Sequence, residues 1–236
     1  MKHLKLFESF NLEDIDAICQ KYNIGNYTIN EDGSIDVNGS VYFYLRDLSN
    51  LPPLKFRNVT GDFDCRDNKL TTLKGSPITV GGNFRCVGNL LTSLKDAPES
   101  VGGNFYCHYN ALTSIEGAPK SIGDNFDCSY NKLTSLEGCP KSIGLDIDCR
   151  HNKIVTFEHL PYSIGGDFLC FGNPIDKIWY LFDEDYSKIE FLNDCDALRE
   201  PETVSEEPII ILDRLNFFLE EIGEKTVTEV KGYKCI

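Results

Sequence analysis

The sequence predicts an α/β repeat solenoid in which six short units stack to form a parallel β-sheet. Three columns of residues carry this prediction, because each recurs every 21 residues. A cysteine defines the unit, an asparagine follows it after three places, and a hydrophobic residue precedes it by two. The cysteines are Cys65, Cys86, Cys107, Cys128, Cys149 and Cys170, and the asparagines are Asn68, Asn89, Asn110, Asn131, Asn152 and Asn173. Repetition in register over so many copies is the signature of a repeat protein.

One unit, residues 123–140, shows why each repeat contains a strand. Phe126 and Cys128 alternate with polar residues, the period of a short strand with one buried face. Leu133 points back into the same core, while Pro140 disfavours a helical return, so the convex side is expected to be extended. A single unit cannot bury its own hydrophobic face, so the six must stack. The paired glycines that precede the strands are expected to serve turn geometry.

The residues 1–58 are expected to form an α/β cap at the start of the solenoid, which would otherwise expose its core. Residues 12–19 have the hydrophobic spacing of a helix. Asp32 and Gly33, between two alternating segments, predict a β-hairpin. Residues 41–45 follow as a degenerate first strand.

The repeats are expected to span residues 59–178, and residues 179–236 a mainly helical C-terminal cap. The hydrophobic residues of 175–182 lie on one helical face. Residues 199–208 are acidic and predict a linker. A helix is predicted over residues 210–222, ended by Gly223, and a final strand over residues 227–236.

The repeat unit resembles a known family. Its Phe-x-Cys-x-x-Asn-x-Leu core is similar to the leucine-rich repeat pattern. The short unit, with Asn-x-Leu-Thr-x-Leu followed by a proline, is similar to the bacterial type found in secreted effectors of pathogens, although Leu136-Glu137-Gly138 stands where those units carry Leu-Pro. The resemblance implies a parallel sheet on a concave face that binds a partner.

Almost the whole chain also resembles repeat proteins encoded by large bacteriophages. The start, residues 1–10, the Gly-Asp/Asn-Phe-x-Cys units and the tail from residue 212 to 236 carry this second resemblance. It implies an origin in a bacteriophage rather than an activity. For a phage protein, the expected location is the cytoplasm of the host bacterium.

Charge excludes several classes of partner. Lys and Arg number 23 against 37 Asp and Glu, a formal net charge of −14, whereas nucleic acids and anionic membranes are bound through clustered positive charge. No run of 18 apolar residues predicts a transmembrane helix, and no signal peptide is recognised. We therefore expect a cytoplasmic protein with free thiols, no nucleic-acid partner and no membrane.

The residue types that carry catalysis and metal binding are not arranged for either. No Cys-x-x-Cys motif occurs, and the cysteine column is expected to pack as small hydrophobic side chains. The asparagine column is expected to bond backbone groups of neighbouring repeats. His108 and His151 stand two repeats apart without an evident nucleophile, and no glycine loop for phosphates occurs. We expect no enzyme activity, no metal and no cofactor.

The positions of each strand that point outward are the informative ones, because the repeat does not dictate them. Aromatic and charged residues gather there in the third to fifth repeats, and exposed Tyr and Arg are enriched in interface hot spots. A solvated face with incidental aromatics is the alternative. The predicted partner-binding residues are Arg85, Tyr106, His108, Tyr109, Asp127, Tyr130, Asp148, Arg150 and His151.

The leading functional hypothesis is a non-enzymatic binding module whose concave face recognises a protein, with inhibition of a host or defence protein as its biological role. One alternative is a sponge for a small signalling ligand. Against it, anionic ligands need clustered cations, and the outward arginines Arg66, Arg85 and Arg150 are diluted by carboxylates. A second alternative is a structural component of the virion.

Overall fold

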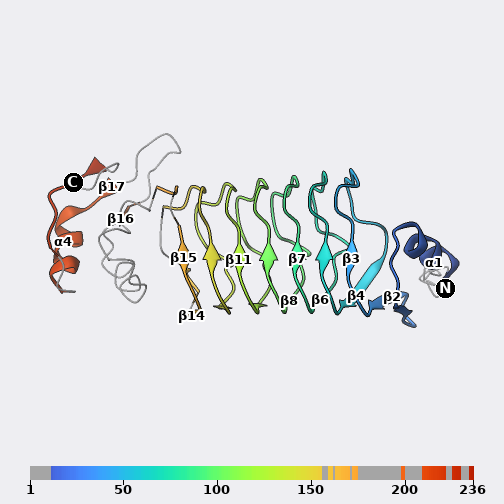
Figure 1. Ribbon diagram of the computed structural model, residues 1–236. Coiled ribbons are helices and arrows are strands. Elements are labelled where there is room, and N and C mark those ends of the chain that lie inside the picture. The colour runs from blue at the N-terminus through green and yellow to red at the C-terminus, as the bar shows by residue number, and fades with distance from the viewer. Residues whose placement is uncertain are drawn as a thin grey trace, which may run out of the picture.

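The computed structural model describes residues 12–155, 159–161, 163–170, 172–174, 198–199, 209–221, 225–229 and 234–236. Its main body is a β-solenoid of about six turns with a period of 21 residues, and the turns run along one axis between α1 (Leu12–Lys21) and α4 (Leu212–Glu221) (Figure 1). The predicted solenoid and its period are confirmed. Each turn contributes strands to two parallel sheets, and the described turns contain no helix.

The first of these sheets, sheet B, contains the predicted strand of each unit. The hydrophobic residue two places before each cysteine opens the strand, and each strand pairs in parallel with its counterpart one turn away, as in Phe84 with Phe105. The degenerate strand is also present, since Val41 pairs with Phe63. The strands are β3 (Val41–Tyr42), β5 (Phe63–Asp64), β7 (Phe84–Arg85), β9 (Phe105–Tyr106), β11 (Phe126–Asp127), β13 (Ile147–Asp148) and β15 (Phe168–Leu169).

The second sheet, sheet A, corrects the expectation of a merely extended opposite side. The dipeptide before the glycines of each unit alternates a small outward residue with a buried aliphatic one, and it pairs with the same dipeptide in the next turn. A strand two residues long carries too little pattern to be recognised alone. The parallel strands are β2 (Ser34–Val37), β4 (Lys55–Val59), β6 (Thr79–Val80), β8 (Ser100–Val101), β10 (Ser121–Ile122), β12 (Ser142–Ile143) and β14 (Ser163–Ile164).

One continuous core lies between the two sheets. The rings of Phe63, Phe84, Phe105 and Phe126 follow one another with centroids 5.3 to 5.8 Å apart. The cysteine column beside them is buried, at 0–4% exposure. Cys65, Cys86, Cys107, Cys128 and Cys149 of this column are free thiols, so the ladder packs as hydrophobic side chains.

The asparagine column satisfies backbone groups as predicted. The Asn131 amide nitrogen donates to the carbonyls of Cys107 and Cys128, both at 3.1 Å, and its Oδ1 accepts from the Leu112 N–H at 3.0 Å. Asn89, Asn110, Asn152 and Asn173 bond the same way. Asn68 donates likewise, but its Oδ1 accepts from the N–H groups of both Arg46 and Leu48. These amides tie each turn to its neighbour and leave few loop groups unpaired.

A second polar ladder was not predicted. Asp62, Asn83 and Asn104 each accept, through Oδ1, the backbone N–H one repeat later, at 2.8 to 3.1 Å. Asn125 and Asp146 continue the ladder. Because this column contains both Asp and Asn, the sequence alone did not reveal that all its members accept a backbone N–H.

In the glycine column, glycine is required for a different reason from the one that the sequence analysis expected. Gly81, Gly102, Gly123, Gly144 and Gly165 have no positive φ. A Cβ at any of them would lie 1.7 to 2.3 Å from the carbonyl oxygen of the residue one turn earlier. Glycine is therefore required by the close approach of neighbouring turns rather than by turn geometry.

The ends of the solenoid carry the remaining described elements. Helix α1 is followed by the predicted hairpin, formed by β1 (Tyr27–Ile29) and β2 around Gly33, whose φ is 74°. At the other end, β16 (Leu198–Arg199), β17 (Ile209–Ile210) and β18 (Lys234–Cys235) form a small sheet beside α4. The predicted helix over residues 175–182 and the linker residues 200–208 lie outside the described residues.

The domain boundaries remain predictions. Among the described residues, no helix is both long and apolar enough to cross a membrane.

Candidate functional site

All nine predicted site residues lie on the outer side of sheet B. We call this surface the sheet B face and define it by three columns: the residue before each repeat cysteine, the residue after it, and the next one, which lies beyond the end of the strand. It contains the strand that the sequence analysis assigned to a concave face; the concavity itself stays a prediction. The nine residues come from four consecutive turns, in which paired strands bring them side by side.

The third column of this face has an unusual backbone. Its members Asp67, Gly88, Tyr109, Tyr130, His151 and Gly172 all have positive φ, between 51° and 77°. This left-handed conformation suits glycine, and a non-glycine residue there costs about 1–2 kcal/mol. Three large rings nevertheless occupy it in consecutive turns.

These rings form a continuous stack, which we call the aromatic ladder: Tyr109, Tyr130 and His151. The centroids of the two tyrosines are 4.5 Å apart, and those of Tyr130 and His151 are 4.4 Å apart, with nearly parallel planes. Their separation matches the spacing of strands, so the stack runs along the solenoid axis. Tyr109 is 55% exposed and Tyr130 41%, leaving the ladder open to a partner.

Beside the ladder lies a half-buried pair. The His108 Nδ1 is 2.9 Å from the Asp127 Oδ2, but its direction is not that of a hydrogen bond, so we regard the pair as a close polar contact. Asp127 also accepts from the N–H and hydroxyl of Ser129. Tyr106 packs edge-on against His108 with centroids 6.1 Å apart.

Two carboxylates in the first column of this face have opposite pKa shifts. Burial raises the pKa of Asp64 more than its bonds to Arg66 lower it. Burial also acts on Asp127, but the contacts with His108 and Ser129 outweigh it and lower its pKa. Equivalent places in the repeat therefore have different electrostatic surroundings.

The arginines of the face are neutralised by carboxylates. Arg85 Nη1 is 2.7 Å from Asp62 Oδ2. Arg150 binds Asp148 through Nε and Nη2. Arg66 Nε lies 3.4 Å from Asp64 Oδ2. The face thus presents no cluster of uncompensated cations among its described residues.

Two exposed tyrosines of this face were not among the predicted site residues. Tyr42 and Tyr44 belong to the turn of the degenerate strand and extend the first two columns of the face toward α1. They are 48% and 44% exposed, and the guanidinium of Arg66 lies 5.4 Å from the ring centre of Tyr44. Aligning residues 41–45 with the later strands could have found them, but that turn lacks the cysteine.

The thiols and histidines that the structure describes have separate surroundings. Burial raises the pKa of the Cys107, Cys128 and Cys149 thiols, and a protonated thiol is a poor nucleophile and metal ligand. No group of His, Cys, Asp and Glu in the described part could hold a metal ion. His108 contacts Asp127 whereas His151 stacks on Tyr130, so they have different partners.

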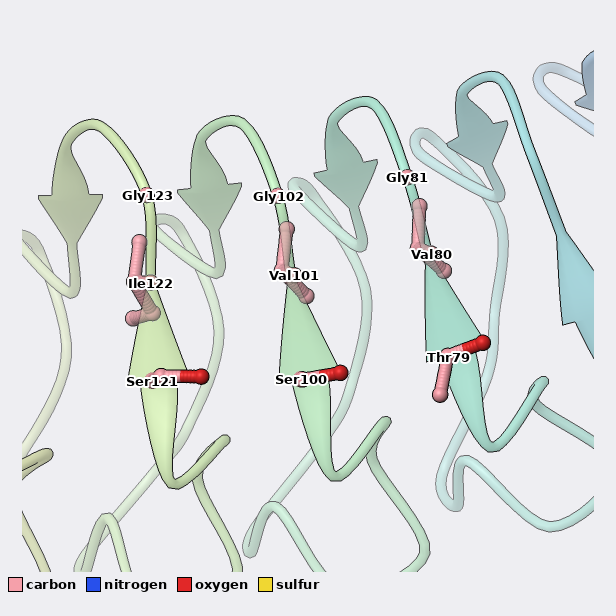
Figure 2. A pocket seen from close by; sticks show the side chains of 9 residues that line it. All are labelled: Thr79, Val80, Gly81, Ser100, Val101, Gly102, Ser121, Ile122 and Gly123. Atoms are coloured by element: carbon pink, nitrogen blue, oxygen red, sulfur yellow. The ribbon is translucent and has the colours of Figure 1, made fainter.

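A shallow groove of about 410 Å³ lies on the opposite sheet. Figure 2 shows the hydroxyls of Thr79, Ser100 and Ser121 side by side on neighbouring strands, next to the glycine column. Thr79 donates to Asn58 at 2.6 Å. The groove is lined by small residues and contains no titratable group.

The chain was compared with protein families, curated proteins and solved structures. No protein-family model matches the chain, and neither a curated protein nor a solved structure resembles it significantly. The class that the fold defines is a β-solenoid repeat protein. The resemblances to leucine-rich repeats and to phage repeat proteins stay predictions.

Proposed function

We propose that this protein is a non-enzymatic binding module that recognises another protein through the sheet B face. The aromatic ladder is the observation that carries the proposal. Packing does not require rings at these positions, since glycine occupies the same column in two other turns. Backbone strain retained by exposed side chains is typical of functional sites.

The chemistry of the face fits protein recognition. Tyrosine offers a large contact area with little rotamer freedom to lose, and rings with paired charges around them form the composition of interface hot spots. An anionic signalling ligand fits less well, because Arg66, Arg85 and Arg150 already face carboxylates.

The type of repeat, the origin of the protein and the identity of its partner form part of the proposal. The Phe-x-Cys-x-x-Asn-x-Leu unit and the bonding of its asparagine column support a leucine-rich-repeat type of solenoid. The resemblance to phage proteins supports a phage origin and, with it, a host protein as partner and inhibition of a host or defence protein as the role.

Affinity purification tests the proposal. Tagged protein is expressed in a bacterial host, recovered and examined by mass spectrometry beside two variants. Tyr106→Ala/Tyr130→Ala removes rings from the sheet B face, and Ser100→Ala/Ser121→Ala makes a matched change on sheet A.

We expect a host protein that the wild type and the serine variant retain and the tyrosine variant loses. A partner retained equally by all three would contradict the assigned face. A copurifying small molecule without a protein would favour the sponge, and recovery of the chain in purified phage particles would favour a virion component.

A further inference from the structure

The aromatic ladder ends abruptly at Gly88. Its rings stack along the axis, so each covers the face of the next. Tyr109 is the first ring, and the residue before it in the column, Gly88, has no side chain. The Tyr109 ring face that points away from Tyr130 is therefore not covered by the column, consistent with its 55% exposure.

Two neighbouring side chains lie near this ring. His108, in the same turn, packs edge-on against Tyr109 with ring centroids 5.5 Å apart, and it also contacts Asp127 of the following turn. Asp67, the column member before Gly88, leans toward the space: its Oδ1 lies 2.6 Å from where a Cβ on Gly88 would be. The backbones of Asp67 and Tyr109 lie two strand spacings apart, about 9.6 Å.

The Tyr109 ring and the Asp67 carboxylate thus flank Gly88 on the outer surface. We call this place the Gly88 slot. A planar group that stacks on the exposed ring of Tyr109 would lie beside the Asp67 carboxylate.

The charges around the slot favour a cationic group over an anionic one. Among the described residues, the exposed Asp67 carboxylate has no ion pair, whereas Asp64, Asp62 and Asp148 are each matched by an arginine. The ring face of Tyr109 is itself electron-rich and attracts cations. Nothing in the slot offers a positive charge to an anion.

The geometry points to the Gly88 slot as a binding site for an arginine side chain of the partner protein, stacked on Tyr109 and paired with Asp67. A guanidinium is planar, stacks on aromatic rings and bonds carboxylates, properties that lysine combines less well. The inference rests on the proposed use of the sheet B face and names the chemistry of its partner.

A peptide pair tests the slot directly. The probe is acetyl-Ser-Thr-Arg-Thr-Ser-amide, titrated into isotope-labelled full-length protein at low salt while NMR follows the amide of Gly88. The control peptide carries citrulline, which keeps the shape of arginine without its charge. We expect the citrulline peptide to bind about tenfold more weakly, since it loses both the cation–π contact and the ion pair.

Four variants assign the contacts. Asp67→Asn and Tyr109→Ala should each weaken the arginine peptide about threefold, whereas Tyr109→Phe, which keeps the ring, should bind unchanged. Gly88→Asn should abolish binding by filling the slot. Asparagine tolerates positive φ, and thermal unfolding verifies that each variant is folded.

Equal binding of the two peptides, absence of binding at several millimolar, or indifference to Asp67→Asn would overturn the inference. The partner recovered by affinity purification separates its failure from that of the proposed function. A partner that needs Tyr106 and Tyr130 but ignores Asp67 leaves the function standing without the slot. A partner that ignores all three, beside an arginine peptide that still binds, leaves the slot without the function.

Discussion

The two sheets of the solenoid face solvent with very different surfaces. On sheet A, the outward residue of each strand is small and nearly invariant, from Thr79 through Ser100 and Ser121 to Ser163. On sheet B, the equivalent position runs through Asp64, Arg85, Tyr106, Asp127, Asp148 and Leu169. From β5 and β6 onward, both sheets have the same period, strands of two residues and parallel pairing.

The difference shows where the repeat is constrained and where it is free. Sheet A lies next to the glycine column, where adjacent turns approach so closely that a Cβ has no room. Sheet B has the same core columns below it, but its outward side chains meet solvent, one another and, for Arg85, the neighbouring Asp62. Diversity on that face is therefore allowed by packing, and the strained ladder within it is the basis of the proposed binding surface.

The largest expected effect separates the core from both faces. Phe126→Ala deletes a fully buried ring between the sheets and should lower the free energy of unfolding by about 3–5 kcal/mol. Ser121→Ala, an outward change on sheet A, should shift it by less than about 0.5 kcal/mol. Urea denaturation followed by circular dichroism compares them, and similar losses would contradict the assignment of the core.

Substituting the outward residues of each face tests which of the two faces binds the partner. Tyr106→Ala/Tyr130→Ala should weaken binding of the partner by about 2 kcal/mol or more, the scale of interface hot spots. Ser100→Ala/Ser121→Ala should leave it unchanged. Isothermal titration with the purified partner measures both. If the tyrosine variant binds normally, the site lies elsewhere, and the acidic segment of residues 199–208 is the next candidate.

The glycine column offers a test of close approach. A Cβ on Gly123 would lie 1.9 Å from the Gly102 carbonyl oxygen, so Gly123→Ala should destabilise the fold by about 1–3 kcal/mol through backbone shifts. Gly25 has nothing within 4 Å of its Cβ position and no positive φ, so Gly25→Ala is the matched control. Thermal unfolding of both tests this, and equal stability would show that the turns can separate freely.

The smallest expected effect distinguishes two carboxylates of the sheet B face. The pKa of Asp127 is lowered in the folded state, so its ionised form contributes stability above the unfolded pKa, and this is lost as pH falls through the folded value. Asp127→Asn should lower the free energy of unfolding by about 1 kcal/mol at pH 7, with the difference shrinking in acid.

Asp64 provides the opposite control. Its pKa is raised by burial, so its ionisation opposes folding as pH rises, and Asp64→Asn should not destabilise the protein at pH 7. Urea denaturation at pH 7 and at about pH 3 compares the two variants. A larger loss for Asp64→Asn at pH 7 would reverse the assignment.

The sequence by itself determined the period, the buried strand and the residues of the core. Phe126 and Cys128 alternate with polar neighbours within a few residues, so their strand is readable locally, and the repeat then places every copy. The asparagine column was equally readable, because one residue type at one spacing recurs six times. The nine candidate site residues followed from the same register.

Only the tertiary structure decided how neighbouring turns meet. The second sheet, the Asp62–Asn83–Asn104 ladder and the close approach at Gly123 depend on contacts between residues about 21 positions apart, which leave little local pattern. The stacking of Tyr109 on Tyr130 and the neutralisation of Arg85 by Asp62 arise in the same way. A repeat sequence specifies which residues share a column, but whether they stack, pair or leave a slot depends on backbone conformation and on side chains from other turns.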